Sequence, residues 1–192
     1  MQSINKPLFI LITTSFFLFF LKWTLSFFYF PDEGIIMRII NDSHEDSYMY
    51  FHYIKSLADL NFSNIYNTTS SEINFKVFPL GAIIIHTIFF KIFGISSFIF
   101  LEFVSIFSFL FIFFFIFKKL RFNIEHSILL SLICYFLPYL ASVANFFEIP
   151  ELNTFVTNFY NLRFPRPMIV NLFFFYFFFF LINLNLDTLL NL

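Results

Sequence analysis

Residues 95–117, ISSFIFLEFVSIFSFLFIFFFIF, decide the class of fold. The stretch holds 23 residues and one charged side chain, Glu102. A helix of this length crosses the hydrocarbon core of a bilayer, ~30 Å thick. An ionisable group inside a span is costly and needs either a function or a compensating contact. We expect a structural role: Glu102 pairs with Lys91 or His86 of the preceding apolar segment, or lies near enough to the interface to stay hydrated.

The composition of the whole chain agrees with a membrane protein. Of its 192 residues, 59% are apolar and 39 are phenylalanine, and the mean hydropathy is +0.83. A soluble domain of this size needs polar residues over nearly half of its sequence to cover its surface. The net charge of −1 excludes the basic footprint of a nucleic-acid-binding protein. The single cysteine, Cys134, excludes a disulfide framework and a cysteine-based zinc site.

Three more apolar segments are long enough to span a bilayer, residues 8–30, 125–144 and 168–186. Their runs are continuous, whereas a β-barrel alternates polar and apolar residues over segments of about ten residues. The segment 77–93 is shorter, and it contains the helix-disturbing residues Pro79 and Gly81 as well as a lysine. The sequence therefore predicts an all-α transmembrane bundle of four or five spans, which forms a single membrane domain over residues 1–192.

Basic residues help to decide between four and five spans. Lys6, before the first span, predicts a cytoplasmic N-terminus, and residues 118–123, KKLRFN, form the densest basic cluster. If 77–93 is juxtamembrane or re-entrant, this cluster also faces the cytoplasm, and the polar loops 31–76 and 145–167 share the outer side. If 77–93 crosses, the cluster faces outside, against the positive-inside rule. We favour four spans and, from the Phe, Ile and Asn content, a bacterial inner membrane.

The loop 31–76 is the longest polar segment and holds seven of the twelve carboxylates. Two acidic clusters stand out, one directly after the first span and one at the start of an amphipathic helix expected over 45–60: Asp32-Glu33 and His44-Glu45-Asp46. Acidic groups held at a membrane surface between spans indicate a functional site. The structural alternative is that both clusters begin helices, where carboxylates stabilise the first turn.

Five pieces of the chain follow one another in a recognisable order: Asp32-Glu33, Asp46-Ser47-Tyr48, FPLGAIIIHTIFFKIFG at 78–94, FKKLRF at 117–122 and NLRFPRP at 161–167. In this order they resemble the N-terminal part of the GT-C superfamily of glycosyltransferases, integral membrane enzymes that take sugars from polyprenyl-phosphate carriers. That pattern has an outer loop opening with acidic residues, a Pro-containing apolar helix ending in Phe-Gly, a span ending in basic residues, and a second outer loop. The resemblance covers nearly all of this chain but only the first part of such an enzyme.

The resemblance implies that an acidic residue of the first outer loop is the catalytic base or a metal ligand. The candidates are Asp46, Asp32 and Glu33, and the role stays open between Asp46 and the Asp32-Glu33 pair. A carboxylate can remove the proton from an acceptor hydroxyl as that hydroxyl attacks the anomeric carbon. A divalent cation such as Mg²⁺ or Mn²⁺ is a further possible cofactor, with Glu45 and His44 as its candidate ligands.

The resemblance also implies a basic site for the phosphate of the donor. Arg163 and Arg166, in the motif RFPRP, are the candidates, because guanidinium groups bind phosphate through two parallel hydrogen bonds. The alternative is that these arginines anchor the last span by reaching for the lipid headgroups.

The sequence therefore predicts a glycosyltransferase, or an N-terminal fragment of one, that passes a sugar from a polyprenyl-phosphate donor to a lipid or glycan acceptor at the outer face of the membrane. Its partners would be membrane lipids, the carrier-linked sugar and a second chain that completes the fold. The alternative is a non-enzymatic accessory or flippase-like subunit whose polar residues are interfacial anchors. A transporter is disfavoured, because few polar residues occur in the apolar segments.

Overall fold

The computed structural model describes residues 5–29, 31–32, 34, 48–60, 80–144 and 168–189. Every regular element in these ranges is a helix, which confirms the all-α class. In chain order the helices are α1 (Asn5–Tyr29), α3 (Tyr48–Ala58), α4 (Leu80–Phe93), α5 (Ser96–Lys119), α6 (Ile124–Ala144) and α8 (Met168–Leu189).

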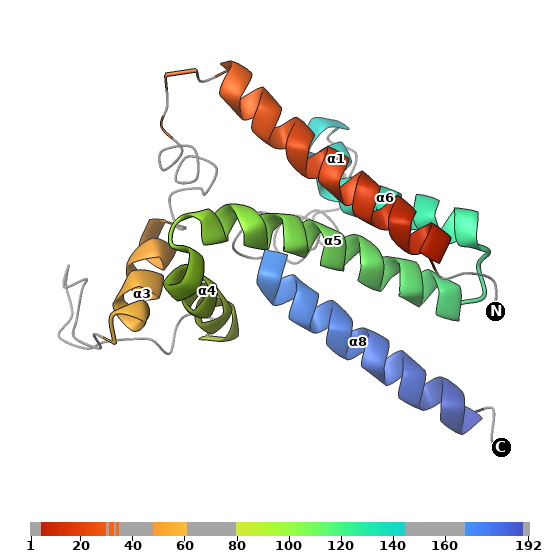
Figure 1. Ribbon diagram of the computed structural model, residues 1–192. Helices are drawn as coiled ribbons and strands as arrows, with labels where there is room; N and C mark the ends of the chain where they lie inside the picture. The colour runs from red at the N-terminus through yellow and green to blue at the C-terminus, as the bar shows by residue number, and fades with distance from the viewer. Residues whose placement is uncertain are drawn as a thin grey trace.

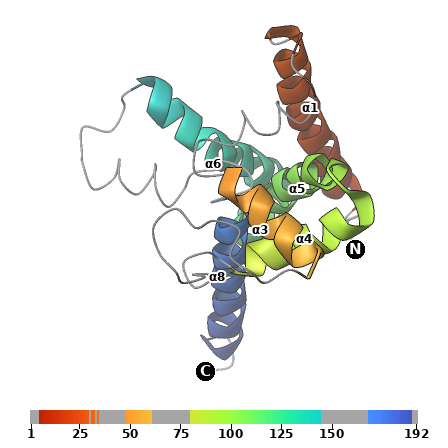
Figure 2. The same cartoon turned by 90° about the vertical axis from the view of Figure 1, so that its left-hand side faces the viewer.

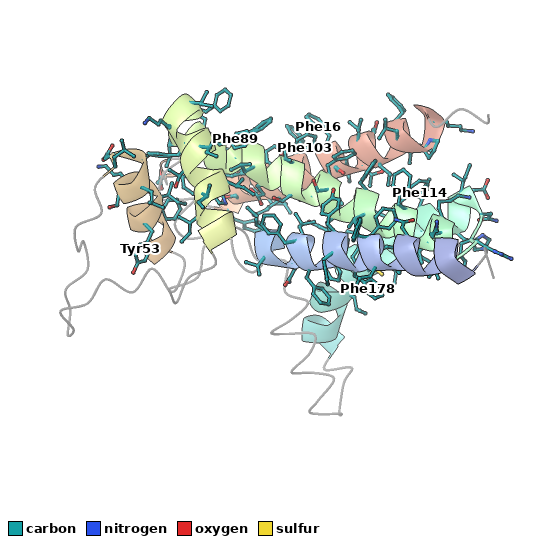
Figure 3. All side chains as sticks on the ribbon, turned by 90° about the horizontal axis from the view of Figure 1, so that it is seen from below. Phe16, Tyr53, Phe89, Phe103, Phe114 and Phe178 are labelled. Carbon is teal, nitrogen blue, oxygen red and sulfur yellow. The ribbon has the colours of Figure 1, made fainter. Side chains whose placement is uncertain are left out.

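Helix α5 is the centre of the fold and contacts α1, α4, α6 and α8 (Figure 1). Its Phe109 is fully buried and meets Tyr135 of α6 and Phe175 of α8 edge to face, with ring centroids 6.0 and 5.7 Å apart. On another side of α5, Phe103 points toward Phe16 of α1 (Figure 3), at 6.4 Å. Such edge-on ring contacts are favourable beyond the area they bury. Phenylalanine side chains, which are abundant in the sequence, therefore form much of the contact between α5 and its neighbours.

Among the described residues, two helices are long and apolar enough to cross a membrane, α1 over Lys6–Tyr29 and α5 over Ser96–Lys119. Only 11% of the most apolar window of α1 is buried inside the protein, against 56% for α5. The exposed side chains of α1 include Phe9, Phe17 and Phe28. A water-soluble protein rarely exposes a continuous apolar surface of this kind. The outer face of α1 therefore fits a lipid environment.

The long helices alternate in direction (Figure 1). The end of α1 and the starts of α5 and α8 lie toward one end of the molecule, and α3 and α4 lie at this same end, which we call the α3–α4 end. The start of α1, the α5–α6 turn and the end of α8 lie at the opposite end. Figure 2, viewed from the α3–α4 end, shows α3 and α4 in front of the long helices.

The α5–α6 turn brings the basic cluster into this opposite end. Arg121 has a left-handed backbone (φ 69°), and Lys118 Nζ donates a hydrogen bond to the Phe122 carbonyl oxygen at 3.1 Å. The side-chain oxygen of Asn123 accepts a hydrogen bond from the backbone N–H of His126 at 2.8 Å. Asn123 therefore caps the first turn of α6, which explains why that helix begins at residue 124.

Helix α4 has only 14 residues. At 1.5 Å per residue it is about 21 Å long, shorter than a bilayer core of ~30 Å. It stops at Gly94, whose left-handed backbone (φ +58°) reverses the chain into α5, and the Gly94 N–H donates a hydrogen bond to the Phe90 carbonyl oxygen at 2.8 Å. Such a left-handed glycine is a common end to a helix. The structure therefore describes the segment 77–93 as a short helix that runs across the end of α5 (Figures 1 and 3).

Candidate functional site

Of the residues predicted to form the catalytic and phosphate sites, the structure describes Asp32 alone. Asp32 is exposed, three residues beyond the end of α1. The other candidates lie outside the described residues: Glu33, His44, Glu45, Asp46, Arg163 and Arg166. The predicted site therefore stays a prediction. The structure adds only that Asp32 is exposed just after the end of α1.

The described helices place the flanks of this site at one end of the molecule. In sequence, Asp46 is separated from the start of α3 by one residue, and Arg166 is separated from the start of α8 by Pro167. The end of α1 and the starts of α3 and α8 all lie toward the α3–α4 end (Figure 1). The elements that adjoin Asp32, Asp46 and Arg166 in the sequence thus lie toward the same end.

A second polar cluster, which sequence reasoning missed, lies between α1 and α5. The Lys22 ammonium forms an ion pair with Glu102 Oε1, and the indole N–H of Trp23 donates a hydrogen bond to Glu102 Oε2 at 3.0 Å. The Glu102 side chain is 5% exposed and that of Lys22 is 38% exposed. We refer to these three residues as the Glu102 cluster. Both carboxylate oxygens of Glu102 are engaged by consecutive residues of α1.

The Glu102 cluster corrects the expected partner of Glu102. The expected partner of Glu102 was Lys91 or His86 of the preceding segment, whereas the cation paired with it is Lys22 of α1. The expectation that Glu102 stays hydrated is also wrong, because the side chain is buried. The sequence did carry a usable signal. Lys22 lies seven residues before the end of α1 at Tyr29, and Glu102 lies six residues after the start of α5 at Ser96. Opposite charges thus occur at nearly equal depth in two antiparallel spans.

The position of this cluster along the helices suits its chemistry. Seven residues of helix span about 10 Å, so the pair lies about two helical turns from the α3–α4 end of both α1 and α5. A buried carboxylate is tolerated when it is paired and hydrogen-bonded. The N–H of Trp23 finds its polar partner in Glu102, as the N–H of a buried tryptophan usually needs. The arrangement fixes the rotation of α1 against α5.

His86 is a further buried ionisable group at the α3–α4 end. Its ring lies on that of Phe98 in α5, with centroids 5.2 Å apart, and Phe51 of α3 contacts Phe98 as well, at 4.5 Å. Burial away from water lowers the pKa of His86 to about 3. A histidine that is neutral at pH 7 packs as an aromatic ring, and it joins α4 to α5.

Within the ranges that the structure describes, no group of three or more His, Cys, Asp or Glu side chains could hold a metal ion. The candidate ligands His44 and Glu45 lie outside those ranges, so the structure does not test them.

Comparison with known proteins gives no relatives: no protein-family model, no curated protein and no solved structure matches the chain. The similarity to GT-C glycosyltransferases therefore rests on the order of the motifs in the sequence.

Proposed function

We propose that the chain is a GT-C-like membrane glycosyltransferase, or the N-terminal part of one. It transfers a sugar from a polyprenyl-phosphate donor to a lipid or glycan acceptor at the outer face of the membrane. The observation that supports the proposal is the helix arrangement. The end of α1 and the starts of α3 and α8, which adjoin the candidate residues in the sequence, lie toward one end of the molecule, and the basic α5–α6 turn lies at the other (Figure 1).

The arrangement favours four crossings. In this proposal α1, α5, α6 and α8 cross in alternating directions, and α4, at 14 residues, does not cross. Lys118, Lys119 and Arg121 then share a side with the start of α1, as the positive-inside rule prefers for the cytoplasm. The loops 31–76 and 145–167 both lie outside, where the acidic and the basic candidates can act on one substrate.

The chemistry assigned to these residues is a single displacement. A carboxylate, either Asp46 or one of Asp32 and Glu33, takes the proton of the acceptor hydroxyl as its oxygen bonds to the anomeric carbon. The bond from that carbon to the phosphate oxygen breaks, and its electron pair leaves with the phosphate. Arg163 and Arg166 stabilise the negative charge of the departing phosphate. The exposure of Asp32 next to the membrane supports this role, because the donor headgroup lies at that level.

The proposal is tested by removing the charge of the three carboxylates together. We expect Asp32→Asn, Glu33→Gln and Asp46→Asn combined to lower the transfer rate by about 100-fold or more, which is the usual effect of losing a general base. The measurement uses membranes that contain the protein as the cell makes it. The donors are undecaprenyl phosphates that carry tritiated glucose or tritiated mannose. Transfer into the endogenous lipid fraction is counted.

Asp59→Asn is the matched control. Asp59 is exposed just after α3, in the same loop but outside both acidic clusters, so the variant removes one charge and should keep full activity. Unchanged transfer in the triple variant would overturn the proposal. The single variants then separate Asp46 from the Asp32-Glu33 pair as the base.

A further inference from the structure

Helix α4 carries an exposed apolar face. Ile84, Ile88 and Ile92 are 50%, 54% and 67% exposed, and they follow one another at intervals of four residues on one side of the helix. We call them the isoleucine stripe. The opposite side of α4 is buried, with Ala82 and Ile83 in the core. The stripe is thus the face of α4 that neither α3 nor α5 covers.

The connection to α5 sets the depth at which the stripe lies. Only Gly94 and Ile95 separate α4 from α5, which has 24 residues and is long and apolar enough to span. At 1.5 Å per residue α5 is about 36 Å long, a few Å longer than the bilayer core, so its first turn lies at the level of the lipid headgroups. Because α4 runs across the end of α5 rather than beside it (Figure 3), the whole of α4 shares this level.

The packing of α4 leaves one of its faces uncovered by α3 and α5. Helix α3 lies on the side of α4 away from the long helices, and α5 lies on the other side (Figures 1 and 3). The remaining face bears the stripe, and its three isoleucines are exposed. Lys91 is exposed beside the stripe, and a lysine next to an apolar stripe can extend its ammonium to phosphate while its methylenes stay in the apolar layer.

We propose that the isoleucine stripe is a membrane-docking face, which seats α4 in the boundary between headgroups and acyl chains of the outer leaflet. Lys91 reaches the lipid phosphates by extending its ammonium beyond its methylene stem. Through its contacts with α3, α4 then holds at this surface the helix that follows the His44-Glu45-Asp46 cluster in the sequence. The inference rests on the four crossings of the proposed function.

The test measures the depth of one label on the stripe. In a Cys134→Ser background, Ile88→Cys carries a bimane fluorophore in vesicles of phosphatidylethanolamine and phosphatidylglycerol. Quenchers are lipids with a nitroxide near the headgroup, lipids with a nitroxide near the end of the acyl chain, and aqueous iodide. Because an interfacial helix buries its apolar face only a few Å deep, we expect shallow nitroxide to quench at least about twofold more than deep nitroxide, with little quenching by iodide.

Two exposed positions give the reference depths. Lys55→Cys, on the exposed side of α3, should be quenched by iodide, and Phe177→Cys, halfway along α8 and exposed, should be quenched best by deep nitroxide. Should Ile88→Cys fail to fold, Ile84→Cys reports on the same stripe.

Three results would overturn the inference. Quenching by deep nitroxide as strong as at position 177 would mean that α4 crosses the bilayer. Strong iodide quenching would mean that the stripe faces water. Protection from every quencher would mean that protein, such as a second copy of the chain, covers the stripe. Because no readout depends on sugar transfer, failure here is distinguishable from failure of the proposed activity.

Discussion

At the scale of single residues, the Glu102 cluster makes the sharpest prediction about stability. Glu102 is 4% exposed and takes its ion pair from Lys22. Breaking a buried ion pair from one side typically costs about 3–5 kcal/mol. Because the Lys22 side chain is 38% exposed, we expect the loss of stability to lie at the low end of that range. Lys22→Met should therefore lower the free energy of unfolding by about 3 kcal/mol, as measured by SDS titration in mixed micelles.

The double variant identifies the cause of that loss. Lys22→Met combined with Glu102→Leu removes both charges, so most of the stability should return. Lys55→Met, an exposed lysine of α3 outside the cluster, should change stability by less than about 0.5 kcal/mol. A double variant as unstable as Lys22→Met alone would show that the unpaired charge is not the source of the loss.

The same residues show where sequence reasoning stops. The cost of an ionisable group in a span makes Glu102 conspicuous from the sequence alone, and that argument holds. Its cation was sought on the segment nearest in sequence, whereas it lies 80 residues away. The pairing depends on which helices are neighbours and on how each is rotated about its axis. Neither property can be read from the hydropathy of one segment.

At the scale of elements, Gly94 ends α4 and makes the turn into α5. Its φ of +58° lies in the left-handed region, which costs a residue with a Cβ about 1 kcal/mol, and a Cβ built there would meet nothing within 4 Å. Gly94→Ala should thus lower the unfolding free energy by about 1 kcal/mol through backbone strain alone, in the same micelle titration.

Gly34→Ala is the matched control for this change. A Cβ at Gly34 also meets nothing within 4 Å, and its backbone does not lie in the left-handed region. The substitution should be neutral or slightly stabilising. Gly94→Asn should fall between the two alanine variants, because asparagine tolerates the left-handed region better than alanine does. Equal losses at positions 34 and 94 would contradict the strain argument.

A comparison of predicted segments with observed helices shows how much of the secondary structure the apolar pattern predicts. The expected segments 8–30, 95–117, 125–144 and 168–186 correspond to helices α1, α5, α6 and α8. Their ends differ by up to three residues, and α5 continues through Lys118 and Lys119, because helix ends depend on capping rather than on hydropathy. The helix expected over 45–60 is described over Tyr48–Ala58.

At the scale of the whole molecule, the alternating helices predict the sidedness of the loops. In a Cys134→Ser background, single cysteines replace Ser47, Asn123 and Asn158, and a membrane-impermeant maleimide is added to intact cells. Four crossings predict labelling at positions 47 and 158 and none at 123, because α4 does not cross and both polar loops lie outside. As a control for the reactivity of each cysteine, the same label is added to detergent-solubilised protein.

Labelling at positions 47 and 123 but not at 158 would mean five crossings. The acidic loop and the RFPRP motif would then lie on opposite sides of the membrane, and no single site could use both. The chain would then be better explained as a non-enzymatic accessory subunit. The topology experiment therefore decides between the two functions without requiring knowledge of the sugar.

The sequence by itself determined the chemical class of the protein: an all-helical chain with apolar segments of membrane length, interrupted by one long acidic loop. Those properties depend on residue type and local spacing, since burial of apolar groups and backbone hydrogen bonding act on each segment separately. Only the tertiary structure decided that Lys22 holds Glu102, that α5 is the central helix, and that α4 lies across the bundle with its isoleucines exposed. Each of these depends on which faces of distant helices meet, and that choice is made by packing over the whole chain.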